Sequence, residues 1–183
     1  MHFGNIKKND IANGEGVRVS LFVSGCRNKC KNCFNPETWN FSYGKKFDEN
    51  TLEDIINSLK PNHINGFTVL GGEPFEEENQ KELLPIIKRI KEEYPNKTIW
   101  MYSGYLYDVD LLPENGKKHT EYTEEILSLI DVLVDGRFVE ELKNLSLKFR
   151  GSTNQRIILV QESLKQNKVV LSPLNEYKVF KPI

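Results

Sequence analysis

Residues 17–33 read VRVSLFVSGCRNKCKNC, an apolar segment that runs directly into a loop with three cysteines. Residues 17–23 are β-branched and apolar with little alternation, which predicts a strand buried on both faces, as in a parallel sheet. Cys26, Cys30 and Cys33 are all the cysteines of the chain, and they lie within eight residues. The strand therefore feeds a candidate metal or catalytic loop, which we assign to residues 24–39.

The composition narrows the class of protein. The 183 residues suit one well-buried core, so we expect a single domain over residues 1–183. No stretch is long and apolar enough to span a bilayer, and the N-terminal residues lack the apolar region of a secretory signal. We therefore expect a cytoplasmic protein with no membrane contact. With a net charge of −1 and no basic stripe, direct nucleic-acid binding is disfavoured.

The remaining segments alternate between strand and helix patterns. Helices are predicted from a capping box at residues 51–54 to Pro61, over residues 79–94 with Pro85 as a kink or first turn, and over residues 123–130 with Thr123 as the cap. Further strands are predicted at residues 67–70, 98–102, 131–134 and 156–160, with a last edge segment at 177–180. Residues 106–121 are polar and turn-rich, and we expect a loop there.

This order predicts an α/β fold with a mainly parallel sheet covered by helices. Four strands end in small or polar residues, and ligands bind at the carboxyl ends of parallel strands. We therefore expect one site where these ends meet. The four strand ends are Ser24-Gly25, Gly71-Gly72-Glu73, Ser103-Gly104 and Asp135-Gly136.

Three cysteines spaced C-x₃-C-x₂-C suit an iron–sulfur cubane with one open position. Each of the four irons needs one outside ligand, so three thiolates leave the fourth iron open to a substrate. The alternative is a zinc site completed by a carboxylate or by His2, His63 or His119, although no histidine has the short spacing that such sites usually show. In a cytoplasm that keeps thiols reduced, a disulfide is disfavoured.

The stretch Gly71-Gly72-Glu73-Pro74 is a second constellation at a strand end. Two glycines let the backbone approach a ligand closely, and Glu73 can accept hydrogen bonds from an ammonium group. Taken alone, GGEP is more often a turn after a strand. Its position behind a three-cysteine loop favours the ligand-binding interpretation.

Together these features resemble the radical S-adenosylmethionine enzymes, and within them the family that activates anaerobic (class III) ribonucleoside-triphosphate reductase. An aromatic residue often precedes the third cysteine in the superfamily, whereas here Asn32 precedes it and Phe34 follows, which favours this subfamily. The matching blocks cover about residues 4–160 in order. They are NGEGVR (13–18), FVSGC (22–26), CFN (33–35), TW (38–39), GGEP (71–74), IW (99–100), SGY (103–105), DVLVDGRF (131–138) and RGSTNQR (150–156).

The resemblance implies one 4Fe-4S cluster and S-adenosyl-L-methionine as cofactors. A radical from the cleaved S-adenosylmethionine would take a hydrogen from a glycine of the reductase, which is the partner, and a reduced flavodoxin-like protein would supply the electron. It implies these site residues: Cys26, Cys30 and Cys33 for the cluster, and Asn32, Cys33, Phe34, Gly71, Gly72, Glu73, Ser103, Gly104, Asp135 and Arg137 for S-adenosylmethionine. Residues 150–156 would complete the nucleoside site or meet the reductase.

The chain is too short for a full eight-unit barrel, so we expect a partial, open barrel of about five or six strands. A reactive radical must be kept from water, and a partner that closes the open side would do this. Two alternatives stay open at this point. One is another radical enzyme, such as an activator of the pyruvate formate-lyase type or a deazaguanine synthase, and the other is a non-catalytic zinc or electron-transfer module.

Overall fold

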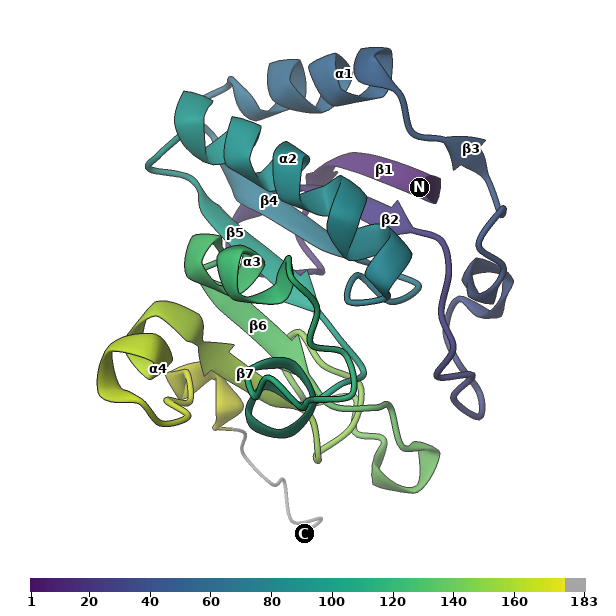
Figure 1. Ribbon diagram of the computed structural model, residues 1–183, viewed down its shortest axis with the longest axis vertical. Coiled ribbons are helices and arrows are strands. Elements are labelled where there is room, and N and C mark those ends of the chain that lie inside the picture. Colours follow the sequence, from purple (N-terminus) through teal and green to yellow (C-terminus); the bar gives the residue numbers. More distant parts are fainter. Residues whose placement is uncertain (177–183) are drawn as a thin grey trace, which may run out of the picture.

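The computed structural model describes residues 1–176, and they form a mixed α/β structure around one sheet (Figure 1). The strands are β1 (His2–Asp10), β2 (Val17–Val23), β3 (Lys45–Lys46), β4 (Ile64–Gly71), β5 (Thr98–Tyr102), β6 (Val132–Asp135) and β7 (Arg156–Leu159). The α-helices are α1 (Glu49–Leu59), α2 (Glu77–Glu93), α3 (Thr123–Leu129) and α4 (Val160–Gln166). No helix in this part of the chain is long and apolar enough to cross a membrane.

The sheet is open, with the order β3-β1-β2-β4-β5-β6-β7. Its centre, β2-β4-β5-β6, is parallel as predicted, whereas β1, β3 and β7 pair antiparallel at the two edges. Seven strands exceed the five or six expected. The additional ones are β1, a mostly polar and half-exposed strand without an apolar run, and the two-residue β3. A barrel-like curvature stays a prediction.

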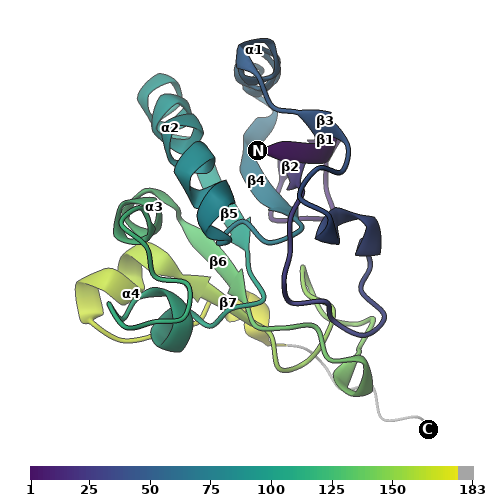
Figure 2. The same cartoon turned by 45° about the vertical axis from the view of Figure 1, so that its right-hand side comes forward.

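Alternate residues of the central strands face two different environments. Val19, Leu21 and Val23 of β2 belong to the main core under the helices, which lie along one face of the sheet (Figure 2). Phe22, between them, points to the other face, where the cysteine loop and residues 136–155 lie. The helix-free face is therefore the one that carries the candidate site.

The predicted helices are present, but their starts differ from the prediction. Helix α1 begins at Glu49, because the side chain of Asp48 accepts a hydrogen bond from the Thr51 backbone N–H and caps the helix three residues early; the predicted capping box was wrong. Pro85 lies inside α2, so it does not mark the first turn. Thr123 is the first residue of α3 rather than its cap.

Residues 106 onward agree with the sequence predictions only in part. Residues 106–121 lack strands, as predicted, but contain a π-helical turn at Tyr107–Leu111. Helix α4 follows β7 directly and was not predicted. The expected edge segment at residues 177–180 lies outside the described residues.

Candidate active site

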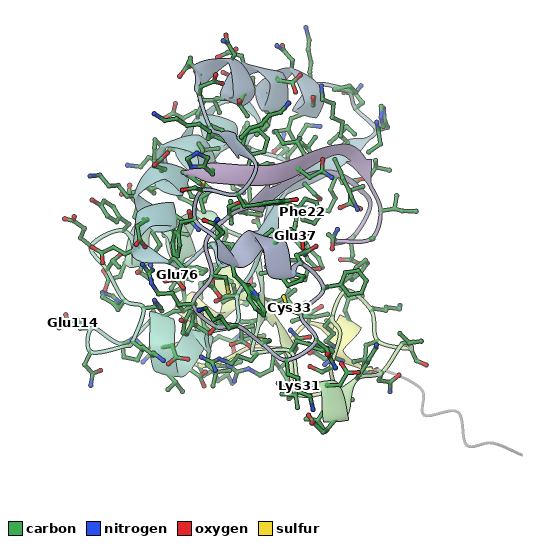
Figure 3. The ribbon with its side chains drawn as sticks, turned by 90° about the vertical axis from the view of Figure 1, so that its right-hand side faces the viewer. Phe22, Lys31, Cys33, Glu37, Glu76 and Glu114 are labelled. Atoms are coloured by element: carbon green, nitrogen blue, oxygen red, sulfur yellow. The ribbon has the colours of Figure 1, made fainter. Side chains whose placement is uncertain are left out.

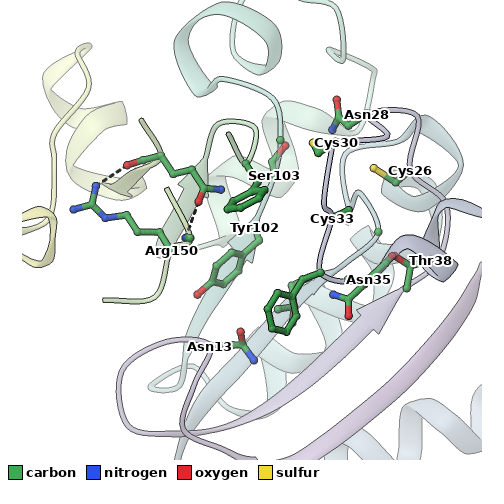
Figure 4. Close-up of a pocket in the computed structure, with 18 of the residues that line it drawn as sticks. Asn13, Cys26, Asn28, Cys30, Cys33, Asn35, Thr38, Tyr102, Ser103 and Arg150 are labelled. Carbon is green, nitrogen blue, oxygen red and sulfur yellow. Dashed lines mark hydrogen bonds between the residues drawn. The ribbon is translucent and has the colours of Figure 1, made fainter. Parts of the chain in front are cut away.

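The carboxyl ends of β2, β4 and β5 open into a cavity of about 630 Å³ on the helix-free face (Figure 4). Most of the expected site residues line it, which supports the convergence predicted from the strand ends. They are Cys26, Cys30, Asn32, Cys33, Phe34, Gly71, Gly72, Glu73, Ser103 and Gly104. Ser24, Gly25, Asp135 and Arg137 do not line it, although Cys26 after Gly25 and Gly136 after Asp135 do.

Glycine lets the ends of β2 and β4 lie against each other. Gly71 has a φ of +108°, and a Cβ there would lie 2.8 Å from the backbone of Phe22. The Gly72 N–H donates to the Val23 carbonyl at 2.7 Å, and the Glu73 N–H donates to the Gly25 carbonyl at 2.8 Å. Because left-handed φ values strain other residues, these two strand ends need glycine to meet in this way.

The cysteine loop turns its three thiols toward the cavity. Lys29 and Asn32 both have positive φ values, which makes the loop tight, and the Cys33 N–H donates to the Cys30 carbonyl at 3.2 Å. Cys26 is buried, Cys30 and Cys33 are half-buried, and none of the three forms a disulfide. Figure 3 shows Cys33 and Lys31 on this loop from its outer side.

The surroundings of Cys26 and Cys30 raise the pKa of these two thiols and so favour their protonated form. Burial raises the pKa of Cys26 to about 11, with Glu73 adding to the rise, while backbone N–H groups of Asn28 and Lys29 oppose it. Burial and the neighbouring Cys33 also raise the pKa of Cys30, against Arg137. Iron binds thiolate, so loading of this loop must release protons.

These donors fit a cluster better than a single ion. Three thiols on one loop, with backbone N–H groups directed at the sulfur of Cys26, match the hydrogen bonding that tunes iron–sulfur sites. Cysteines of a cubane bind different irons, so they need not surround one point. In residues 1–176, no three His, Cys, Asp or Glu side chains are grouped to hold one metal ion.

The histidines offered for zinc lie elsewhere. His63 contacts Asn9, and His119 Nδ1 lies 2.8 Å from the Leu111 carbonyl oxygen. His2 is in the edge strand β1. None of the three lines the cavity that holds the cysteines.

Glu73 is buried at the back of the cavity, where its carboxylate accepts four hydrogen bonds. Oε1 accepts from the Phe75 N–H and the Ser103 hydroxyl, each at 2.9 Å. Oε2 accepts from the Gly104 N–H at 2.8 Å and from Asn28 Nδ2 at 3.1 Å. Burial raises the pKa of Glu73 to about 7, and these donors oppose the rise. Glu73 therefore ties β4, β5 and the cysteine loop together, and an ammonium group would reach it by displacing Asn28.

Sequence reasoning missed a second carboxylate, Glu76. Its side chain is fully buried, and it accepts hydrogen bonds from the Arg27 N–H at 2.8 Å, the Arg27 guanidinium at 2.7 Å and Lys118 Nζ at 2.6 Å. Arg27 also stacks over Phe41, 4.4 Å from the ring centroid. Glu76 thus fastens the residue after the first cysteine. The extension of GGEP to GGEPFEE is the signal that could have identified it.

At the ends of β5 and β6, most polar groups are already hydrogen-bonded within the chain. Ser103 and Gly104 are held by Glu73, and a Cβ on Gly104 would lie 2.4 Å from Asn28 Nδ2. Asp135 is buried and bonded to the Arg156 guanidinium and to the Tyr107 N–H. Residues 150–156 form a closed loop in which Gln155 accepts from two backbone N–H groups, and Arg150, Gly151 and Gln155 line the cavity.

The mouth of the cavity is apolar and exposed. Phe34 on the cysteine loop is 96% exposed, and Leu145 on residues 139–149 is 92% exposed, yet both line the same cavity. Deeper inside, the buried Tyr102 hydroxyl has no hydrogen-bond partner among the described residues. Exposed apolar side chains that gather at the opening of a cavity are typical of a surface that meets another molecule.

Comparisons with known proteins agree with this geometry. Residues 12–158 match the family described as a 4Fe-4S single cluster domain. Similar proteins are named anaerobic ribonucleoside-triphosphate reductase-activating protein. The one from Haemophilus influenzae is 44% identical over 81% of this chain and 91% of its own length. The one from Pasteurella multocida is 41% identical over 86% and 96%, and the one from Enterobacteria phage T4 is 35% identical over 86% and 93%.

Proposed function

Because the chain belongs to the family of anaerobic ribonucleoside-triphosphate reductase-activating proteins, we propose that it generates the glycyl radical of that reductase. The observation that carries the proposal is the single cavity that all three cysteines share with the GGEP strand end. The chain is then a radical S-adenosylmethionine oxidoreductase. It acts on a protein substrate, from which it removes one hydrogen atom.

A 4Fe-4S cluster on Cys26, Cys30 and Cys33 would supply one electron to S-adenosylmethionine, whose cleavage gives methionine and the 5′-deoxyadenosyl radical that takes the glycine hydrogen. The chain's own residues prepare the place for this chemistry. Glu76 fixes Arg27 and with it the start of the cysteine loop. Glu73 fixes Asn28 and Gly104 beside each other in the lining of the cavity, since both donate to its Oε2.

We assign S-adenosylmethionine to the strand-end side of the cavity. Gly71 and Gly72 line it with backbone, because their missing Cβ atoms let this strand end pack against Phe22 and Gly25. Asn32 and Phe34 flank the third cysteine and suit the adenosyl group, and Ser103 and Gly104 lie beside Glu73. Asp135 and Arg137 would need a rearrangement to contact this ligand, since neither lines the cavity.

The reductase glycine would enter through the apolar rim. A radical must be shielded from water, and the chain leaves Phe34 and Leu145 exposed at the mouth of its own cavity. A protein segment that covers both side chains would close the site and bury apolar area at the same time. This argument favours a partner protein over a small-molecule substrate.

Three further assignments belong to the proposal. The chain works as one activase domain over residues 1–183, and its open sheet serves as a partial barrel. A reducing cytoplasm would keep the three thiols ready for iron. A reduced flavodoxin-like protein would deliver the electron.

The test combines the reduced, cluster-loaded protein with S-adenosylmethionine and a class III reductase under anaerobic conditions. We expect the glycyl radical doublet by electron paramagnetic resonance, and we expect Cys30→Ala to abolish both cluster retention and 5′-deoxyadenosine formation. A doublet with pyruvate formate-lyase but not with the reductase would move the assignment to the other activators. A protein that stays colourless after reconstitution, with one zinc and no sulfide, would contradict the radical mechanism.

A further inference from the structure

The outer side of the cysteine loop carries cations that the chemistry inside the cavity does not use. In CRNKCKNC, Arg27, Lys29 and Lys31 alternate with other residues between the cysteines, and no Asp or Glu occurs from residue 25 to residue 36. The thiols line the cavity, whereas Lys29 and Lys31 are exposed to solvent. Figure 3 shows Lys31 at the outer margin of the loop. The loop thus has a thiol side and an ammonium side.

Of these three cations, Arg27 is already neutralised by the chain itself. It forms ion pairs with Glu76 at 2.7 Å and with Glu78 at 2.6 Å. Lys31 has one distant partner, Glu141 at 3.9 Å, and its side chain is 77% exposed. Lys29 has no ion pair within residues 1–176. The charges of Lys29 and Lys31 are therefore available to another molecule.

The two sides of a cluster on this loop cannot serve the same molecule. The cavity side has to admit S-adenosylmethionine and the glycine of the substrate protein. The outer side, where Lys29 and Lys31 are the immediate sequence neighbours of Cys30, leaves a second route by which an electron can reach the cysteines. A donor docked there would lie beside Cys30, and the Lys31–Glu141 pair marks where this surface approaches the residue 139–149 segment at the rim.

We propose that Lys29 and Lys31 form the docking surface for an acidic one-electron donor protein. This inference rests on the proposed function, because it requires a cluster on the three cysteines. The donor loses one electron and the cluster gains it, with no bond formed and no proton moved between the proteins. Complementary charge accelerates such encounters, and salt weakens the effect over a Debye length of about 10 Å at 0.1 M.

The test measures how fast an acidic flavodoxin, in its fully reduced form, reduces the cluster-loaded protein in a stopped-flow instrument. We expect Lys29→Glu/Lys31→Glu to lower the second-order rate constant by about tenfold or more at low salt, and this difference to vanish at high salt. We also expect calorimetry to show weaker binding of the oxidised flavodoxin. The matched control is Lys45→Glu/Lys46→Glu, which reverses two exposed lysines on the edge strand β3.

A small reductant separates docking from damage to the cluster. Photoreduced deazaflavin should reduce wild type and both double variants at the same rate, with equal iron and sulfide contents. Equal effects of the two double variants on the flavodoxin reaction would overturn the proposal. So would an equal loss with deazaflavin, because the lysines would then act on the cluster itself. If deazaflavin-reduced wild type never activates the reductase, the proposed function fails instead.

Discussion

Replacing Glu76 by Gln should loosen the cysteine loop and destabilise the apoprotein far more than the same change at Glu78. Both carboxylates bind the Arg27 guanidinium at nearly the same distance, 2.7 and 2.6 Å, but the Glu76 side chain is fully buried and the Glu78 side chain is 52% exposed. Breaking a buried pair costs about 3–5 kcal/mol, and solvent screening leaves exposed pairs with about 0–1 kcal/mol. Because Arg27 is half-exposed and Gln keeps one acceptor, we expect about 2–3 kcal/mol for Glu76→Gln.

The assay is urea and thermal denaturation of the two apoprotein variants beside wild type, followed by iron and sulfide analysis after reconstitution. A loss of 2–3 kcal/mol corresponds to a fall in Tm of roughly 5–10 °C for a chain of this size. We also expect Glu76→Gln to lose its cluster faster to a chelator, since the Arg27 N–H and Lys118 lose a charged partner. Equal destabilisation by the two variants, or normal cluster retention in Glu76→Gln, would refute the reasoning.

The remaining predictions concern the cluster, the rim and the strand ends. The affinity of the cysteines for the cluster should rise with pH, by up to tenfold per pH unit for each thiol still protonated. The reason is that burial raises the pKa of Cys26 to about 11 and iron displaces that proton. Chelator competition from pH 7 to 9 measures this affinity, and a flat or falling affinity would contradict the prediction. Leu145→Asp should raise the KM for the reductase about tenfold and leave 5′-deoxyadenosine formation without reductase unchanged. The control Val109→Asp, which changes a 58% exposed side chain outside the cavity lining, should change neither quantity. Gly104→Ala should weaken S-adenosylmethionine binding about tenfold, as measured by equilibrium dialysis, because its Cβ would occupy the space beside Asn28 Nδ2 and 3.5 Å from Glu73 Oε2. Unchanged binding would contradict the placement of the ligand beside Glu73.

The sequence predicted the parallel centre of the sheet well because those strands are buried on both faces. Their apolar runs are continuous, and Val17–Val23 and Thr98–Tyr102 were predicted with their observed bounds. The strands β1 and β3 at one edge of the sheet lack such continuous apolar runs. Strand β1 is mostly polar, because its outer neighbour is the two-residue β3, and it carries no periodic signal of its own.

The same contrast holds for the site. Cysteine spacing and GGEP were visible because their chemistry depends on local order along the chain. The roles of Glu76 and Asn28 depend on contacts across 49 and 45 residues, with Arg27 and Glu73 respectively, which no local pattern encodes. Glu73 was expected to face a ligand, and two of its four donors, Ser103 and Gly104, reach it only because β5 lies beside β4.

The most direct test of the central claim follows the hydrogen atom itself. A class III reductase labelled with α-deuterated glycine is incubated with the reduced, cluster-loaded protein and S-adenosylmethionine, and the 5′-deoxyadenosine is analysed by mass spectrometry. We predict one deuterium per molecule of 5′-deoxyadenosine formed, in proportion to the glycyl radical. Unlabelled 5′-deoxyadenosine, or a glycyl radical without any 5′-deoxyadenosine, would contradict the account.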